Sequence, residues 1–380
     1  MTSPPPNNST DLYEINEGIA QTLIPAMAYV GFMMLFGVLG NVLVCFVFIK
    51  KMKRGTQNFL ITSLAVFDLL SSLLAMPVEI ADMRYYYTFH SEVACKLLRF
   101  INALCCLSSI VTLLAIAIDR YLKVCRPLET QMKLRQAKLS VGVAVCAGLA
   151  FSWPALVIYG IRTVQTEVVG VLGKDCSTSD SMIDTLYPLV YHAVLAVGFI
   201  AFTVALIVLY GLICVSAKKH KRYMARTSDI GKSISGKKHT SMSSLECSTS
   251  NARLSDIDDV QPQLSKDSTK RETTLRRRRM KDKTTVIGFV VTLVFVLSFL
   301  PFLSLVGARS VFKNFDYDLK GAAMVAFNVF IRSYFVNSAA NPIIYGVLNV
   351  RFRQESIVLF KRMMCCAKFQ SSSLQQTSSQ

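Results

Sequence analysis

Residues 18–49 read GIAQTLIPAMAYVGFMMLFGVLGNVLVCFVFI and contain no charged side chain. A helix needs about 20 predominantly apolar residues to cross the hydrocarbon core of a bilayer, and this stretch exceeds that length. The basic run KKMKR at residues 50–54 follows it directly, whereas no Lys or Arg precedes it. Since positive side chains concentrate on the cytosolic side, the stretch predicts a membrane-spanning helix whose N-terminus lies outside the cell.

Six further apolar stretches follow the first one. They cover about residues 59–80, 97–122, 139–161, 185–216, 284–308 and 321–347. We expect helix in each stretch, because backbone amides in lipid need hydrogen-bond partners within the same segment. The sequence therefore predicts an all-α membrane protein, a bundle of seven transmembrane helices whose C-terminus lies in the cytosol.

The composition of the chain agrees with this prediction. Of the 380 residues, 52% are hydrophobic and 17% are charged, whereas soluble proteins carry about 25% charged residues. The net charge of +18 taken alone would suggest a nucleic-acid partner. However, 33 of the 42 Lys and Arg side chains fall in segments predicted to be cytosolic, where they face anionic membrane lipids. We therefore expect no nucleic-acid partner.

The segments outside the bilayer divide the chain further. We expect a disordered extracellular N-terminus at residues 1–23, spans one to five within 24–216, a basic, Ser/Thr-rich and disordered intracellular loop at 217–283, and spans six and seven within 284–347. The sequence leaves open whether the ends of that loop extend spans five and six as helix.

Three modifications are expected from the predicted topology. Asn7 and Asn8 begin overlapping sequons on the outer side, of which at most one is glycosylated for steric reasons. Cys95 and Cys176 form an isolated pair on the oxidising outer face, which indicates a disulfide bond. Cys365 and Cys366 follow basic residues a short distance past span seven, which is typical of palmitoylation sites.

Polar side chains inside the predicted spans are costly and therefore indicate function. The deepest ones are Asn41, Asp68, Ser109, Asn337, Ser338 and Asn341. A buried carboxylate surrounded by hydroxyl and amide groups binds a cation, or it forms a structural hydrogen-bond cluster between helices. The composition of the group leaves both alternatives open.

Several motifs stand in a fixed order along the predicted spans. They are GNV at 40–42, LAVFD at 64–68, Cys95, Asp119-Arg120-Tyr121, Trp153, FVLSFLP at 295–301 and NPIIY at 341–345. In this order and at these depths, the chain resembles the rhodopsin-like (class A) G protein-coupled receptors. The resemblance implies a multi-pass plasma-membrane receptor that performs no enzymatic chemistry. It also implies a heterotrimeric G protein as partner, regulation by receptor kinases and arrestin, an amphipathic eighth helix at 348–364, and a cytosolic tail at 365–380.

The resemblance also implies roles for single residues. Asp68, Ser109, Asn337, Ser338 and Asn341 correspond to the family's sodium pocket, so we expect no required cofactor but a sodium ion as allosteric modulator. The coupling and activation residues are Asp119, Arg120, Tyr121, Tyr210, Phe295, Phe299, Pro301, Pro342 and Tyr345. The chain departs from the family pattern at Phe202, Phe299 and Lys281. Lys281 stands where an acid would pair with Arg120, and its presence predicts raised basal activity.

Four residues are expected in the ligand pocket, namely Glu79, Asn102, Phe299 and Phe335. Asn102 stands where amine receptors have an aspartate, and Phe335 where opsins have their retinal lysine, so neither ligand class is favoured. Residues 163–173 predict a β-hairpin, which is common in peptide receptors, and Glu79 is expected to pair with a basic side chain of the ligand.

The ligand class predicted from these features is an extracellular neuropeptide, in a receptor of the cholecystokinin or orexin type. The alternatives are a non-amine small molecule or a lipid. A different class of protein, an ion-coupled transporter or channel that uses Asp68, is disfavoured by the odd number of spans and the single deep carboxylate. Ligand identity, G protein subtype and oligomeric state do not follow from the sequence.

Overall fold

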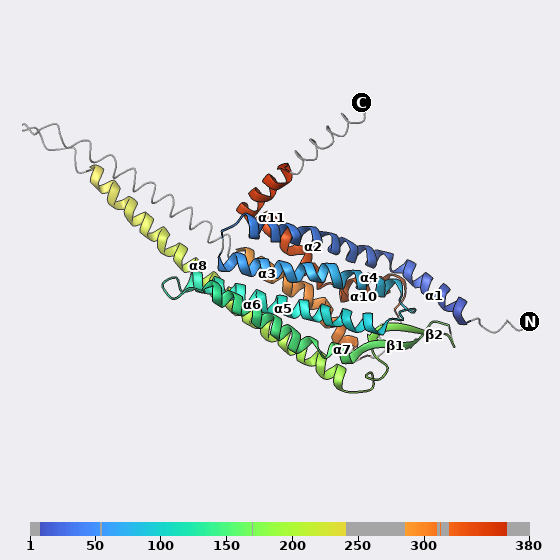
Figure 1. Cartoon of the computed structure of the whole chain (residues 1–380). Helices are drawn as coiled ribbons and strands as arrows, with labels where there is room; N and C mark the ends of the chain where they lie inside the picture. Colours follow the sequence, from blue (N-terminus) through green and yellow to red (C-terminus); the bar gives the residue numbers. More distant parts are fainter. Residues whose placement is uncertain are drawn as a thin grey trace, which may run out of the picture.

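The computed structural model describes residues 8–53, 55–168, 170–240, 286–309, 312 and 319–362. Within these ranges, the chain folds into a bundle of long helices that lie side by side, with a short β-hairpin at one end (Figure 1). Six helical segments are long and apolar enough to cross a membrane. They are Ile24–Lys50, Thr56–Arg84, Glu92–Cys125, Leu134–Ile158, Tyr187–Lys219 and Val286–Arg309.

Several of these segments consist of more than one helical element. The first span is α2 (Ile24–Lys50), and the third is α5 (Glu92–Cys125). The second joins α3 (Thr56–Leu70), a π-helical turn η1 (Ser71–Ala75) and α4 (Met76–Arg84), and Pro77 is the second residue of α4. The fourth is α6 (Leu134–Ser152) followed by α7 (Ala155–Ile158), and it is interrupted at Pro154 as expected for a proline that removes a backbone donor.

The seventh apolar stretch forms two short helices, α10 (Gly321–Ile331) and α11 (Phe335–Leu348). Residues 332–334 between them form a turn, so the predicted single span at 321–347 is interrupted there. The helix α11 packs closely against α2, because a Cβ atom added at Gly40 would lie 2.6 Å from the ring of Pro342. Glycine is therefore needed at this contact.

The N-terminal segment differs from the expected disorder. Residues Asn8–Thr22 form helix α1, which continues the line of α2 at the outer end of the bundle (Figure 1). The buried Asn16 donates to the carbonyl of Arg84 at 3.1 Å and accepts from the amide of Tyr87 at 2.9 Å. Glu17 pairs with Arg84 at 2.8 Å. These contacts hold α1 against residues 84–87, and they could not be predicted from the sequence of the N-terminal segment alone.

The end of the bundle predicted to be cytosolic contains two helical extensions. Helix α8 (Tyr187–Thr240) continues past Lys219 into the loop predicted at residues 217–283, so the end of span five extends as helix, one of the two alternatives left open, and residues 241–285 lie outside the described ranges. A further helix at residues 350–362 lies where the eighth helix was predicted. Its Phe352 is buried and stacks on Phe48, with ring centroids 5.8 Å apart. The predicted glycosylation site Asn7 and palmitoylation sites Cys365 and Cys366 lie outside the described residues.

A β-hairpin covers part of the outer end of the bundle. Strands β1 (Tyr159–Gln165) and β2 (Leu172–Thr178) pair antiparallel, which confirms the hairpin predicted from the sequence. Cys176 on β2 forms a disulfide bond with Cys95 near the start of α5, with Cα atoms 5.5 Å apart. The predicted bridge is therefore confirmed, and it fastens the hairpin to the third span.

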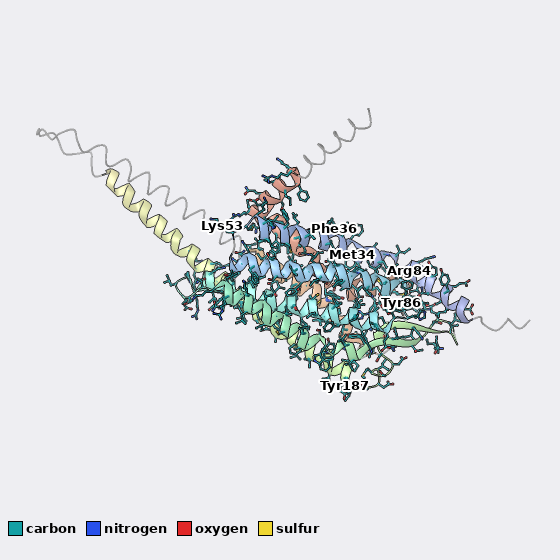
Figure 2. All side chains as sticks on the ribbon, viewed as in Figure 1. Met34, Phe36, Lys53, Arg84, Tyr86 and Tyr187 are labelled. Carbon is teal, nitrogen blue, oxygen red and sulfur yellow. A yellow bond between two sulfur atoms is a disulfide. The ribbon has the colours of Figure 1, made fainter. Side chains whose placement is uncertain are left out.

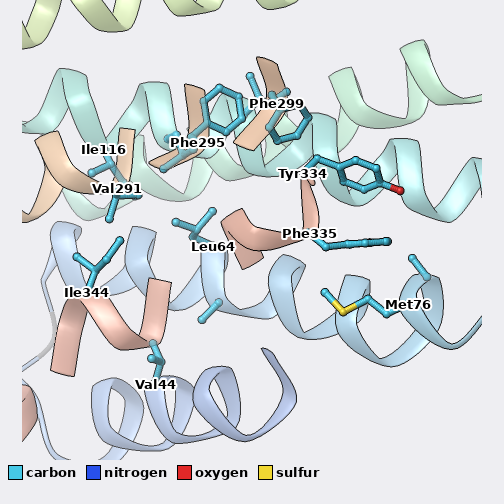
Figure 3. Packing of buried hydrophobic residues seen from close by; sticks show 14 of the residues in the cluster. Val44, Leu64, Met76, Ile116, Val291, Phe295, Phe299, Tyr334, Phe335 and Ile344 are labelled. Atoms are coloured by element: carbon cyan, nitrogen blue, oxygen red, sulfur yellow. The ribbon is translucent and has the colours of Figure 1, made fainter. Parts of the chain in front are cut away.

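Apolar side chains occupy both the outer and the inner surfaces of the bundle. Phe36 and Tyr187, on the outside, are 52% and 69% exposed (Figure 2), as suits helices that face lipid. Inside, Phe295 and Phe299 extend from the helix Val286–Arg309 toward Tyr334 (Figure 3). The ring centroids of Phe295 and Phe299 lie 4.7 Å apart, and those of Phe299 and Tyr334 lie 5.9 Å apart. This aromatic layer separates an outer polar region from a deeper one.

Candidate functional site

The deeper polar region is centred on Asp68, which is 1% exposed on α3. Ser338 donates from Oγ to one carboxylate oxygen of Asp68 at 2.9 Å, and Asn341 donates from Nδ2 to the other at 2.7 Å. Asn41 on α2 donates to the carbonyl of Ser338 at 3.0 Å. The structure thus brings together four of the six deep polar residues, from spans one, two and seven.

Ser109 and Asn337 lie beside this group and line a small cavity. The cavity has room for about one water molecule. Its walls are Ser71, Cys105, Cys106, Ser109, Phe299, Tyr334, Asn337 and Ser338. Among the described residues, the Oδ1 atoms of Asn337 and Asn341 are buried without a hydrogen-bond partner. These spare oxygens and the Asp68 carboxylate fit a small hard cation such as sodium, which prefers oxygen ligands.

A second polar group, the outer charge cluster, consists of Glu79, Asp82, Arg99 and Arg332. The two carboxylate oxygens of Glu79 accept one arginine each, from Nη1 of Arg99 and from Nε of Arg332, both at 2.8 Å. A single oxygen of Asp82 accepts from Nη2 of Arg99 at 3.3 Å and from Nη2 of Arg332 at 2.9 Å. The cluster has no net charge, and it links spans two, three and seven.

Neighbouring groups hold the two arginines in place. Arg99 also donates to the carbonyl of Cys176 at 3.0 Å, and its guanidinium lies 5.8 Å from the ring centre of Tyr159. Arg332 also donates from Nη1 to the side-chain oxygen of Asn328 at 2.7 Å. Burial raises the pKa of the Tyr159 hydroxyl, although the positive charge of Arg99 acts in the opposite direction. The Tyr159 hydroxyl therefore stays neutral at physiological pH.

The predicted ligand-pocket residues take different positions. Glu79 has a side chain only 2% exposed and both oxygens paired, so it is not the free counter-ion that we expected for a basic ligand. Asn102 donates to the hydroxyl of Tyr334. Phe299 belongs to the aromatic layer, and Phe335 is 1% exposed within the core near Met76 (Figure 3).

The sequence reasoning missed three members of the outer charge cluster, namely Asp82, Arg99 and Arg332. By the predicted span limits, Asp82 lies just outside span two, and Arg99 and Arg332 lie within spans three and seven. One signal could have found them, because charged residues within apolar spans pair with each other rather than face lipid. Two acids and two bases at the outer ends of three spans meet that condition.

The cytosolic end places the predicted coupling residues together. Arg120 lies 3.6 Å from the carboxylate of Asp119, which also accepts from Lys123 at 2.7 Å. Arg120, Tyr210 and Tyr345 line one small cavity between the helices. A Cβ atom added at Gly288 would lie 2.6 Å from the Tyr210 hydroxyl, so the helix Val286–Arg309 approaches α8 closely here.

The remaining predicted switch residues lie along the path between these regions. Phe295 is completely buried, and it packs against Phe199 with ring centroids 5.6 Å apart. Pro301 lies within the helix Val286–Arg309, and Pro342 lies within α11 against Gly40. Tyr121 is partly buried, and its hydroxyl accepts from Arg126 at 3.3 Å. Their roles in activation stay a prediction.

Comparison with known families identifies the chain. Residues 40–345 match the family described as 7 transmembrane receptor (rhodopsin family). The chain belongs to this family. The prediction of a seven-helix receptor fold is therefore confirmed, with α10 and α11 together forming the seventh span. The receptor is a multi-pass membrane protein that signals through G proteins and performs no enzymatic reaction.

Known receptors resemble this receptor at low sequence identity. Neuromedin-U receptor 1 of Mus musculus is 25% identical over 350 residues, which are 88% of this chain and 72% of the relative. Neuromedin-U receptor 2 of Homo sapiens is 25% identical over 83% of this chain and 67% of its own length. Probable G-protein coupled receptor 19 of Rattus norvegicus is 25% identical over 92% and 70%. Two of these three relatives are named as neuromedin-U receptors.

Proposed function

We propose that this receptor lies in the plasma membrane, binds an extracellular neuropeptide and activates heterotrimeric G proteins in response. The neuropeptide class is supported by the similarity to neuromedin-U receptors. It is also supported by the β-hairpin that the Cys95–Cys176 bridge fastens over the bundle, because such a rigid outer surface suits an extended ligand. In this proposal, the N-terminus and the hairpin face the extracellular side, and the C-terminal ends of α5 and α8 face the G protein.

The proposed mechanism is a shift between two conformations. The ligand binds more tightly to a state in which the cytosolic half of the helix Val286–Arg309 moves away from α8. The close approach of Gly288 to Tyr210 marks the contact that this movement opens. Arg120 lies beside that contact and becomes available to the G protein. Receptor kinases and arrestin then act on the activated receptor at its cytosolic side.

We further propose that a sodium ion binds at Asp68 and favours the state without ligand. Asp68, Ser338 and Asn341 would hold the ion with their oxygens, and Ser109 and Asn337 lie at the adjoining cavity. The ion would supply a positive charge that stabilises the buried carboxylate.

The single observation that carries the receptor mechanism is the cavity at which Arg120, Tyr210 and Tyr345 meet. A neuropeptide library, applied to cells that contain a promiscuous calcium-coupled G protein, tests it. We expect active peptides to raise calcium through the wild-type receptor and not through an Arg120→Ala receptor at equal surface density. An Arg135→Ala receptor is the matched control, since Arg135 is exposed in the first turn of α6 (Leu134–Ser152) and lies outside the predicted coupling residues. Full signalling by the Arg120→Ala receptor would contradict the mechanism.

A second cell line, which lacks G proteins, tests the competing class, an ion-coupled transporter that uses Asp68. A transporter would move charge across the membrane on ligand addition in cells that lack G proteins, whereas the proposed receptor gives no such current.

A further inference from the structure

The outer charge cluster contains two carboxylates in unequal positions. Glu79 lies on the inner side, with a side chain 2% exposed and each oxygen bound to a different arginine. Asp82 lies on the outer side, with a side chain 15% exposed, and it reaches both arginines with one oxygen only. Asp82 is therefore the carboxylate that can be exchanged, and Glu79 is the one that holds the arginines together.

The supply of donors and acceptors in the cluster is also unequal. An arginine offers five N–H groups and accepts none. The Nε atom of Arg99 is buried, and it has no hydrogen-bond partner among the described residues. A buried donor without a partner is unfavourable, so the cluster gains from one more acceptor. A basic ligand would add donors instead, and because both oxygens of Glu79 are already in use, only the second oxygen of Asp82 could accept from it.

From this geometry we propose that Arg99 and Arg332 receive a carboxylate group of the ligand, which takes the place of Asp82. The inference rests on the proposed peptide-receptor function and refines its ligand class to an acidic one. One oxygen of the ligand takes the place of the Asp82 oxygen at the two Nη2 atoms, and the other accepts from the unpartnered Nε of Arg99. The displaced Asp82 side chain, which is already 15% exposed, turns outward.

The acidic outer loops do not oppose this ligand class at short range. Eleven acids and six bases lie in the segments predicted to be extracellular. Charges in water are screened over about 8 Å at physiological ionic strength, whereas a partly buried pair is screened much less. Once the ligand reaches the cluster, the two arginines therefore determine which charge it accepts.

A replacement experiment tests the carboxylate site without a known ligand. In a purified Asp82→Ala receptor, the place of the outer carboxylate is vacant, and we expect potassium acetate to raise the melting temperature Tm. At ten times its dissociation constant, acetate should raise Tm by about 3 °C. Acetamide and potassium chloride at the same concentration should not do so, and acetate should leave the wild-type Tm unchanged. An equal rise with chloride, or no rise, would overturn the proposal.

Two further variants cover the case in which the alanine variant does not fold. The Asp82→Asn receptor keeps the shape of the side chain, and the Asp82→Gly receptor leaves more space for the anion. Acetate should stabilise the glycine variant more than the asparagine variant, since the asparagine amide still fills the site. Equal responses of the two would count against exchange at this position.

A signalling experiment tests the same inference on the ligand side. Two peptide libraries are compared, identical except that Asp, Glu and the free C-terminus in one become Asn, Gln and a carboxamide in the other. We expect only the acidic library to raise calcium, with a potency at least about tenfold lower at an Arg332→Lys receptor, because lysine lacks the forked donors. Equal activity of the two libraries would refute the acidic ligand and leave the receptor function standing. Silence of both would instead count against the neuropeptide proposal, and the acetate result still decides the carboxylate site.

Discussion

The guanidinium of Arg332 donates from Nε to Glu79 at 2.8 Å, although the two residues stand 253 positions apart in the chain. Arg332 is the first residue of the turn that interrupts span seven, and Glu79 lies on α4 of span two. The ion pair therefore fastens the interruption of span seven to α4, near the outer end of span two. It also means that replacing either residue by an uncharged one leaves its buried partner with one counter-ion fewer.

We expect the Glu79→Gln receptor to unfold much more easily than the wild type. Removing one partner of a buried ion pair costs about 3–5 kcal/mol, and here two arginines lose a shared carboxylate. The measurement is thermal unfolding of the purified receptor. The Glu92→Gln receptor is the control, since Glu92 forms an exposed pair with Lys96 that is worth at most about 1 kcal/mol. Equal losses in the two variants would disprove the structural role of Glu79.

The close contact between α2 and α11 predicts a different response at two glycines of one helix. A Gly40→Ala receptor should lose about 1–3 kcal/mol of stability, because the added methyl group meets the rigid ring of Pro342 at 2.6 Å. A Gly31→Ala receptor should be as stable as the wild type or slightly more stable, since nothing lies within 4 Å of its new Cβ atom. Thermal unfolding of both variants distinguishes a specific contact from a general effect of alanine on α2.

The local pairing of Arg120 predicts measurable activity without ligand. Within the described ranges, Arg120 pairs with the carboxylate of Asp119 at 3.6 Å, and Asp119 also pairs with Lys123. An Asp119→Asn receptor loses this carboxylate and with it about 0.5–1 kcal/mol of stabilisation of the inactive state. Its basal nucleotide exchange should therefore rise by about two- to fivefold. The Glu129→Gln receptor, which loses only an exposed pair with Arg126, should match the wild type. The wild type itself should exceed mock-transfected cells, and a signal at the mock level would contradict this prediction.

The proposed sodium site predicts an ion-specific effect on basal activity. In wild-type membranes, sodium chloride should lower basal nucleotide exchange relative to potassium chloride at equal ionic strength. In the Asp68→Asn receptor this difference should disappear, because the carboxylate that Ser338 and Asn341 surround is lost. The Ser63→Ala receptor is the control on the same helix, since the hydroxyl of Ser63 donates to the carbonyl of Phe59 one turn earlier in α3. A sodium effect that survives in the Asp68→Asn receptor would place the ion elsewhere.

The spans could be predicted from the sequence because hydropathy acts locally along the chain. The meeting of Asp68 with Ser338 and Asn341 was also accessible, since each of these polar residues is conspicuous within an apolar stretch. The pairing of Glu79 with Arg332 could not be predicted from the sequence, because it depends on how spans two and seven face each other. The order in α1 was missed for a similar reason. Asn16 is satisfied by backbone groups 68 and 71 positions away, and nothing within the segment itself indicates them.

The interruption of span seven has a thermodynamic consequence. Helix α11 begins at Phe335, three positions after Arg332, and it carries Ser338 and Asn341, which bind Asp68. Only two turn residues therefore separate the arginine of the outer charge cluster from the helix that binds Asp68, and a shift of the turn moves the start of that helix. Linkage is reciprocal for equilibrium binding. If a cation at Asp68 lowers the affinity for the ligand by some factor, the ligand lowers the affinity for the cation by the same factor, although the two bind to different atoms.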